Sequence, residues 1–108
     1  MAWTVEFLNE TVEKELEVLP AGLRARFIRI SDLISEHGIR AAKMPDVKHL
    51  QGKLWEMRLK GKDQIARALY VTVFEERVVV VRIFVKKTQK TPPREIKLAL
   101  ERAKEIEK

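Results

Sequence analysis

The chain contains no cysteine among its 108 residues, which excludes disulfide bonds and thiolate metal sites. Its two histidines, His37 and His49, do not have the spacing of metal ligands, and we expect both at the surface. No glycine-rich phosphate loop and no Ser-His-Asp set can be recognised. The sequence therefore predicts no metal and no cofactor.

Long apolar segments are also lacking. The longest apolar runs, such as residues 78–81, fall far short of the roughly 20 residues that cross a membrane. Residues 1–6 have neither the basic start nor the apolar stretch of a signal peptide. We therefore expect a cytoplasmic protein without a membrane partner.

What remains for chemistry is arginine, lysine, glutamate and the single tyrosine, Tyr70. These side chains suit phosphodiester transfer in RNA, where the substrate's own 2′-hydroxyl is the nucleophile. Arginine and lysine can stabilise the pentacoordinate phosphorane, and a carboxylate or a lysine can move the proton. DNA lacks the 2′-hydroxyl and would require a metal or a protein nucleophile, for which the sequence offers no candidate.

The net charge of +6 is unevenly distributed along the chain. Residues 1–39 carry 4 cations and 7 anions, whereas residues 40–62 carry 7 and 2, and residues 86–108 carry 8 and 4. A lysine-rich surface without a binding role would explain the basic composition alone. The segregation favours a polyanionic partner, because a one-sided field steers and holds phosphates.

The spacing of apolar residues predicts one α+β domain over residues 1–108, in the order β-α-α-β-β-β-α. Its small twisted sheet has about four strands, antiparallel except at the N-terminal strand, with an N-terminal helical hairpin and a C-terminal helix. Asn9, Gly38 and Thr91 are expected as helix caps, and residues 39–52 as a basic loop. The expected strands cover residues 3–7, 54–60, 64–74 and 77–85, and the helices cover residues 10–19, 20–37 and 92 onward.

Two arginines interrupt strands that otherwise alternate towards an apolar face. Arg67 lies between Ile65 and Leu69 on one strand face, so it needs a partner, a ligand or a wet patch. Arg58 shares the face of its strand with Glu56. A one-sided antiparallel sheet with a solvated face is the simpler alternative, but the apolar neighbours of Arg67 argue against it.

The last strand and the segment after it carry more cations. Alternation places Arg82 between Val80 and Phe84, with Lys86 further along that face, and a solvated sheet face would explain Arg82. Residues 86–94 then hold four cations and no anion directly before a helix. The N-terminus of a helix mildly repels lysines, whereas a phosphate would satisfy both the lysines and the free backbone N–H groups. A solvated basic linker is the alternative.

Four segments carry a family resemblance: Val-Lys-His-Leu-Gln-Gly at 47–52, Leu-Trp-Glu-Met-Arg at 54–58, Arg-Ala-Leu-Tyr at 67–70 and Phe-Val-Lys-Lys-Thr-Gln-Lys-Thr-Pro at 84–92. Together they resemble the phage-derived HigB-like branch of the RelE/ParE toxin superfamily. The similarity covers nearly the whole chain, and the RelE-like order of elements matches the predicted one. It implies the toxin of a type II toxin–antitoxin pair, an endoribonuclease (mRNA interferase) that cuts messenger RNA, usually on the ribosome, and arrests growth.

The resemblance also implies roles for individual residues. Arg67 corresponds to the catalytic strand arginine that stabilises the cleaved phosphate, and Arg58 corresponds to the basic residue on the preceding strand. Many relatives end near an aromatic residue or a histidine that acts as general acid or stacks on a base, but here a helix follows, so the general acid stays unassigned. Our choice for the base is Glu56. The expected catalytic residues are Arg67, Arg58, Lys86, Lys87 and Glu56. The expected RNA-binding residues are Lys90, Lys53, Lys60, Lys48, Lys43 and Arg94.

Two other functions stay open, because the same superfamily contains DNA gyrase inhibitors without nuclease activity, and a non-enzymatic RNA-binding module is conceivable. The basic strand face and the lysine tail favour RNA cleavage. The resemblance further implies a cognate antitoxin, usually with a helix-turn-helix DNA-binding domain. It would dock either over Arg67 and Lys86 or away from them.

Overall fold

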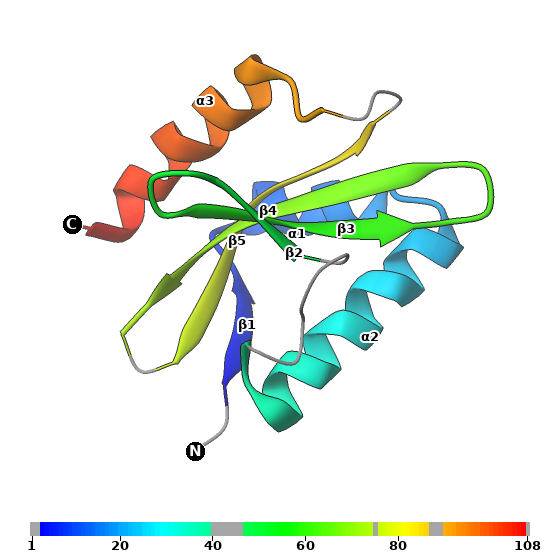
Figure 1. Ribbon diagram of the computed structural model, residues 1–108, viewed down its shortest axis with the longest axis horizontal. Helices are drawn as coiled ribbons and strands as arrows, with labels where there is room; N and C mark the ends of the chain where they lie inside the picture. The colour runs from blue at the N-terminus through cyan, green and yellow to red at the C-terminus, as the bar shows by residue number, and fades with distance from the viewer. Residues whose placement is uncertain (1–2, 40–46, 75, 87–89, 108) are drawn as a thin grey trace.

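The computed structural model describes residues 3–39, 47–74, 76–86 and 90–107, which form a five-stranded sheet with helices on both faces (Figure 1). This confirms the predicted α+β class, although about four strands were expected. The strand order across the sheet is β1-β5-β4-β3-β2. None of the described helices is long and apolar enough to cross a membrane. The elements are β1 Thr4–Phe7, α1 Glu10–Glu17, α2 Ala21–His37, β2 Val47–Gln51, β3 Leu54–Lys60, β4 Ile65–Val73, β5 Arg77–Lys86 and α3 Pro93–Ala103, followed by a 3-10 turn, Lys104–Glu107.

The sheet is mixed, as predicted, because β1 runs parallel to β5 whereas the strands from β2 to β5 pair antiparallel. The additional strand is β2, for which the prediction of a loop is wrong. Val47 is buried in this strand, but Lys48 and His49 are exposed. An edge strand pairs on one side only and buries few side chains, so its sequence shows little alternation.

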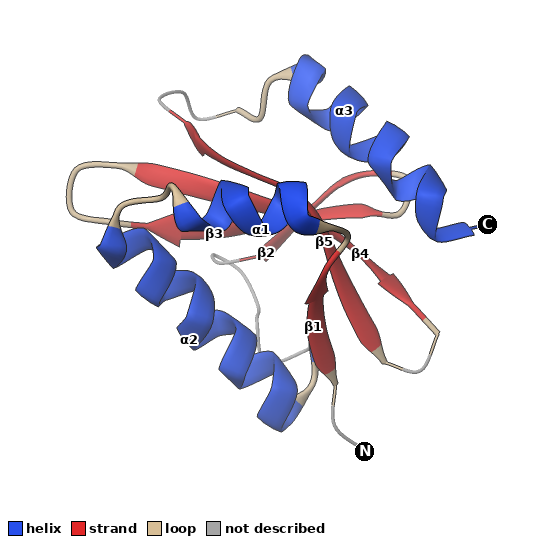
Figure 2. Ribbon diagram, turned by 180° about the vertical axis from the view of Figure 1, so that it is seen from behind, coloured by secondary structure: helices blue, strands red, loops and turns tan. Residues whose placement is uncertain are grey.

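Helices cover the sheet on both sides (Figure 1 and Figure 2). On one face α1 and α2 form the larger core, where Phe27 of α2 belongs to the same buried cluster as Met57 and Tyr70. On the other face α3 forms a smaller core, in which Ala99 packs with Leu69. We call this second side the α3 face.

The two expected caps of the helical hairpin are present. The Val12 backbone N–H donates to the side chain of Asn9 at 3.2 Å, and Gly38 ends α2 with a φ of 89°, a conformation that glycine adopts without strain. The last helix differs, since its N-cap is Pro92 and no side chain caps it. The prediction that Thr91 caps this helix is therefore wrong.

A β-bulge in β5 changes which residues share a face. Leu69 of β4 pairs with Arg82, but the next residue, Tyr70, pairs with Val80, so Val81 is the additional residue. Arg82 therefore lies on the α3 face, whereas Val80 belongs to the core under α1 and α2. The prediction that Arg82 and Val80 share a face is wrong, because a strict period of two does not continue through a bulge.

Only the first four residues of β5 pair with β1. The rest of β5 is an edge of the sheet. Glu15 of α1 accepts a hydrogen bond from the Ile83 backbone N–H at 3.0 Å, and Arg102 of α3 donates to the Val81 carbonyl at 2.9 Å. Glu15 also forms ion pairs with Arg82 at 2.8 Å and with Arg102 at 3.0 Å. These contacts satisfy backbone groups of the edge and give Arg82 a structural role.

Candidate functional site

Four of the predicted catalytic residues lie together on the α3 face. Arg58 of β3 pairs directly with Arg67 of β4, and Glu56 precedes Arg58 by two residues on the same face. Lys86 ends β5 and pairs with Ile65, two residues before Arg67. We call Glu56, Arg58, Arg67 and Lys86 the basic cluster. Like charges on neighbouring strands destabilise a sheet, so this arrangement requires compensation by Glu56 or by a ligand.

Glu56 lies at the centre of the basic cluster and is 1% exposed. Its Oε2 accepts a hydrogen bond from Arg67 Nη1 at 2.7 Å, and its Oε1 accepts one from Thr91 Oγ1 at 2.6 Å. Arg58 Nε lies 3.7 Å from Oε2, which is an ion pair but too long for a hydrogen bond. Both carboxylate oxygens are therefore engaged within the protein.

Thr91 is the residue of this site that the sequence did not reveal. Instead of capping α3, its hydroxyl donates to Glu56 and lies 3.5 Å from Arg67 Nη1. This hydrogen bond connects the residue shortly before α3 to the basic cluster. Arg67 is only 3% exposed. A threonine before two prolines is typical of a helix start, so the sequence carries no signal for the second role.

Lys86 is 6% exposed, and its Nζ is buried without a hydrogen-bond partner among the residues that the structure describes. Burial lowers the pKa of Lys86 to about 8, the charges of Arg67 and Arg58 act in the same direction, and Glu56 opposes them. A lysine with this pKa can exchange its proton near neutral pH. A buried ammonium in such surroundings points to an anion that the described residues do not provide.

Several of the predicted RNA-binding residues surround the basic cluster at the surface. Lys48 of β2 pairs with Glu56, and Lys60 at the end of β3 pairs with the first residue of β4. Lys90 lies shortly before α3, and Arg94 lies in the first turn of that helix. All four of these cationic side chains are exposed.

The structure does not bring Lys53 to the basic cluster. It lies directly before β3, at the end of the strand away from the β3–β4 turn, and lines a separate hollow together with Trp55 and Arg77. The remaining two predicted residues, Lys43 and Lys87, lie outside the described residues.

A hollow of about 650 Å³ adjoins the basic cluster at the turn between β3 and β4. Residues 60–65 line it together with Val85 and Lys86. Ile65 and Val85 are 38% and 40% exposed, which is high for apolar side chains within strands. Lys86 therefore borders a space that a ligand can enter.

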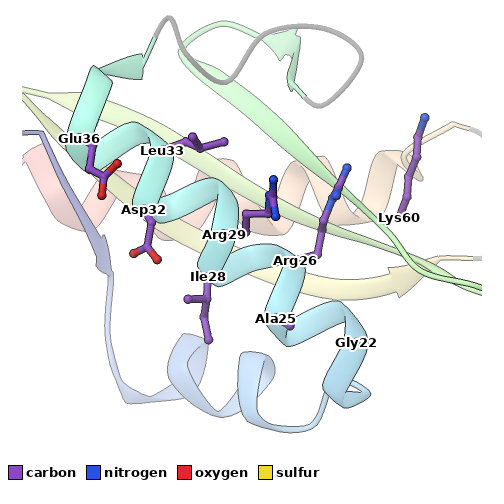
Figure 3. A pocket seen from close by; sticks show the side chains of 9 residues that line it. All are labelled: Gly22, Ala25, Arg26, Ile28, Arg29, Asp32, Leu33, Glu36 and Lys60. Carbon is purple, nitrogen blue, oxygen red and sulfur yellow. The ribbon is translucent and has the colours of Figure 1, made fainter.

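A second, more open hollow of about 630 Å³ runs along the outer side of α2 and shares Lys60 with the first (Figure 3). The side chains of Arg26, Arg29 and Lys60 point in one direction, whereas those of Asp32 and Glu36 point away from them (Figure 3). Positive charge therefore continues from the β3–β4 turn onto one side of α2.

Tyr70, the single tyrosine, lies apart from the basic cluster. It is 1% exposed in the core on the α2 side of the sheet, and burial raises its pKa above the usual range. Within the described part of the chain, no three histidine, aspartate or glutamate side chains come together as a metal site would require. Among the described residues, Lys86 and Glu56 remain as candidates for proton transfer.

The fold is similar to that of a chain in the crystal structure of the archaeal RelE–RelB complex from Pyrococcus horikoshii OT3. The TM-score is 0.56 at 22% sequence identity, and the alignment covers 77% of this chain and 93% of that chain. At this identity the similarity concerns the fold alone. The protein is thus an α+β protein with a RelE-like fold.

The family model of the phage-derived Gp49-like proteins (DUF891) matches residues 14–104, so the chain belongs to this family. A comparison with curated proteins gives no match. The family confirms the phage-derived part of the resemblance, and the solved structure confirms the RelE-like fold.

Proposed function

We propose that this protein is the toxin of a type II toxin–antitoxin pair and a metal-independent endoribonuclease that acts on messenger RNA. The observation that carries the proposal is the excess of positive charge in the basic cluster. Arg58, Arg67 and Lys86 lie around a single carboxylate, that of Glu56. A phosphate of an RNA backbone would supply the missing negative charge and a hydrogen-bond partner for Lys86 Nζ.

In the proposed reaction, the 2′-hydroxyl of the RNA attacks the adjacent phosphorus, gives up its proton to solvent water, and the bond to the 5′-oxygen breaks. The products are a 2′,3′-cyclic phosphate and a 5′-hydroxyl. Arg58 and Lys86 stabilise the negative charge of the phosphorane. The Lys86 ammonium donates its proton to the leaving 5′-oxygen, and its lowered pKa of about 8 makes it a stronger acid than an ordinary lysine.

We assign Glu56 a positioning role instead of that of the base. Its two oxygens accept hydrogen bonds from Arg67 and Thr91, and the side chain is 1% exposed, so no oxygen is directed at a substrate. Arg67 is 3% exposed and the Nζ of Lys86 is buried as well, so neither side chain contacts a phosphate until the site opens. Substrate binding therefore includes displacement of Thr91 from Glu56.

The proposal includes a protein partner, because a free toxin would arrest its own host. The relative with a similar fold was crystallised as a RelE–RelB complex. By analogy we expect a cognate antitoxin with a helix-turn-helix domain, and translated messenger RNA on the ribosome as the cytoplasmic target. Gyrase inhibition is the second candidate function. It is a weaker one, because it would give the buried Lys86 no chemical role.

The test is to map the 5′ ends of cellular RNA minutes after the protein is induced. Wild-type protein should produce new 5′-hydroxyl ends inside translated messages and arrest growth, and Lys86→Met should do neither. Lys104→Ala, at an exposed lysine after α3, is the matched control and should behave like wild type. Growth arrest without new RNA ends, accompanied by loss of DNA supercoiling, would refute the proposal in favour of gyrase inhibition.

Arg67→Ala is a less suitable variant for this test. It removes the cation closest to Glu56, at 2.7 Å, and leaves a buried carboxylate with weaker compensation. Breaking a buried ion pair from one side costs about 3–5 kcal/mol, which can unfold a small domain. Loss of activity in that variant would not separate catalysis from stability.

A further inference from the structure

The hollow at the β3–β4 turn is lined by both charged and apolar side chains. Lys60, Lys62 and Lys86 line it, and Lys86 is 6% exposed. Ile65 and Val85 contribute exposed apolar surface. A nucleotide has the matching chemistry, because its phosphate is anionic and its base offers an apolar face.

The turn that forms this hollow has a fixed shape. The Gly61 N–H donates to the Gln64 carbonyl at 2.8 Å. A Cβ atom at Gly61 would lie 2.8 Å from Leu23 Cδ2 of α2, so the turn backbone packs directly onto that helix. A preformed hollow loses little conformational entropy when it binds a ligand.

We propose that this hollow binds the nucleotide next to the scissile phosphate, and that the RNA strand continues from it towards Arg26 and Arg29 on α2. This inference rests on the proposed ribonuclease function and describes how its substrate is held. Lys60 lines both hollows and joins the two parts of the path.

Within the hollow, we assign contacts with the phosphates and contacts with the base to different side chains. Lys60 and Lys62 are exposed and contact the phosphates that follow the reacting one. Asp63 and Gln64 line the same space and offer a carboxylate and an amide to the Watson–Crick edge of the base. The turn therefore contributes to nucleotide preference as well as to affinity.

The first part of the test measures binding of an RNA hexanucleotide whose 2′-O-methyl groups block the nucleophile, so that binding is separate from cleavage. Lys62→Ala should weaken binding several-fold by fluorescence anisotropy. It should also reduce the slope of log affinity against log salt by about 0.7, the value for one phosphate contact on a single strand. Lys104→Ala is the matched control and should change neither quantity.

The second part compares all four homopolymeric hexanucleotides with wild type and Gln64→Ala. The variant should alter the order of preference, whereas Lys62→Ala should weaken all four alike. If RNA is cleaved but both turn variants behave like the control, the hollow is not the nucleotide site and the proposed function stands. If no RNA is cleaved but the turn variants lose binding as expected, the hollow is an RNA-binding site and the proposed reaction fails.

Discussion

Lys86→Met should stabilise the folded protein while it abolishes RNA cleavage. Methionine keeps most of the length of the side chain and removes the buried charge. Each pKa unit corresponds to about 1.4 kcal/mol, so lowering the pKa from 10.5 to about 8 corresponds to a penalty of roughly 3 kcal/mol in the folded state. Solvent near the side chain screens part of this penalty, so we expect about 1–3 kcal/mol.

The penalty depends on pH with a definite sign. Below pH 8 the lysine is charged in both the folded and the unfolded state, so the full penalty applies. Above pH 10.5 it is neutral in both states, so the penalty disappears. The free energy of unfolding of wild type should therefore rise, relative to Lys86→Met, as the pH increases from 8 to 10.5.

The assay is urea denaturation of wild type, Lys86→Met and Lys60→Met at pH 7 and at pH 10.5. At pH 7, Lys86→Met should be more stable than wild type by about 1–3 kcal/mol. In thermal denaturation, each kcal/mol should raise Tm by about 4–8 °C. Lys60→Met replaces an exposed lysine and should stay within about 0.5 kcal/mol of wild type. A less stable Lys86→Met at pH 7 would refute the reasoning, since it would show that the ammonium stabilises the fold.

Three further substitutions test individual contacts by thermal and urea denaturation. Thr91→Val removes the hydroxyl that donates to Glu56 and should cost about 1–3 kcal/mol; an unchanged stability would mean that the contact contributes nothing. Glu15→Ala removes the acceptor of the Ile83 N–H and one partner of Arg82, so it should lower the free energy of unfolding by about 2–4 kcal/mol. RNA binding should stay intact, and weaker RNA binding would contradict a purely structural role. Gly61→Ala should cost about 1–3 kcal/mol, because its Cβ would lie 2.8 Å from a leucine of α2; full stability would show that the turn can shift.

The sequence predicts most of the fold, because long elements repeat their apolar pattern often enough to be recognised. The strand Leu54–Lys60 and the end of α2 at His37 agree with the prediction. The strand Val47–Gln51 was missed, since an edge strand of five residues with a single buried side chain shows no period. The bulge at Val81 could not be predicted either, because it depends on the pairing with β4 and not on local propensity.

The candidate site was predictable where it follows from alternation along single strands. Glu56 and Arg58 share a face for this reason, and the register between strands then adds Arg67 and Lys86. The burial of Lys86 and the contact of Thr91 with Glu56 were not predictable, because both depend on contacts between residues far apart in the sequence.

The measurement that tests the account most directly is a crystal structure of the protein with a 2′-O-methyl RNA. It should show a phosphate oxygen within hydrogen-bond distance of Lys86 Nζ and close to Arg58, the Thr91 hydroxyl displaced from Glu56, and the strand passing through the hollow at the β3–β4 turn. An RNA bound elsewhere, with Thr91 still hydrogen-bonded to Glu56 and no anion at Lys86, would contradict the assignment of the basic cluster as the site of RNA cleavage.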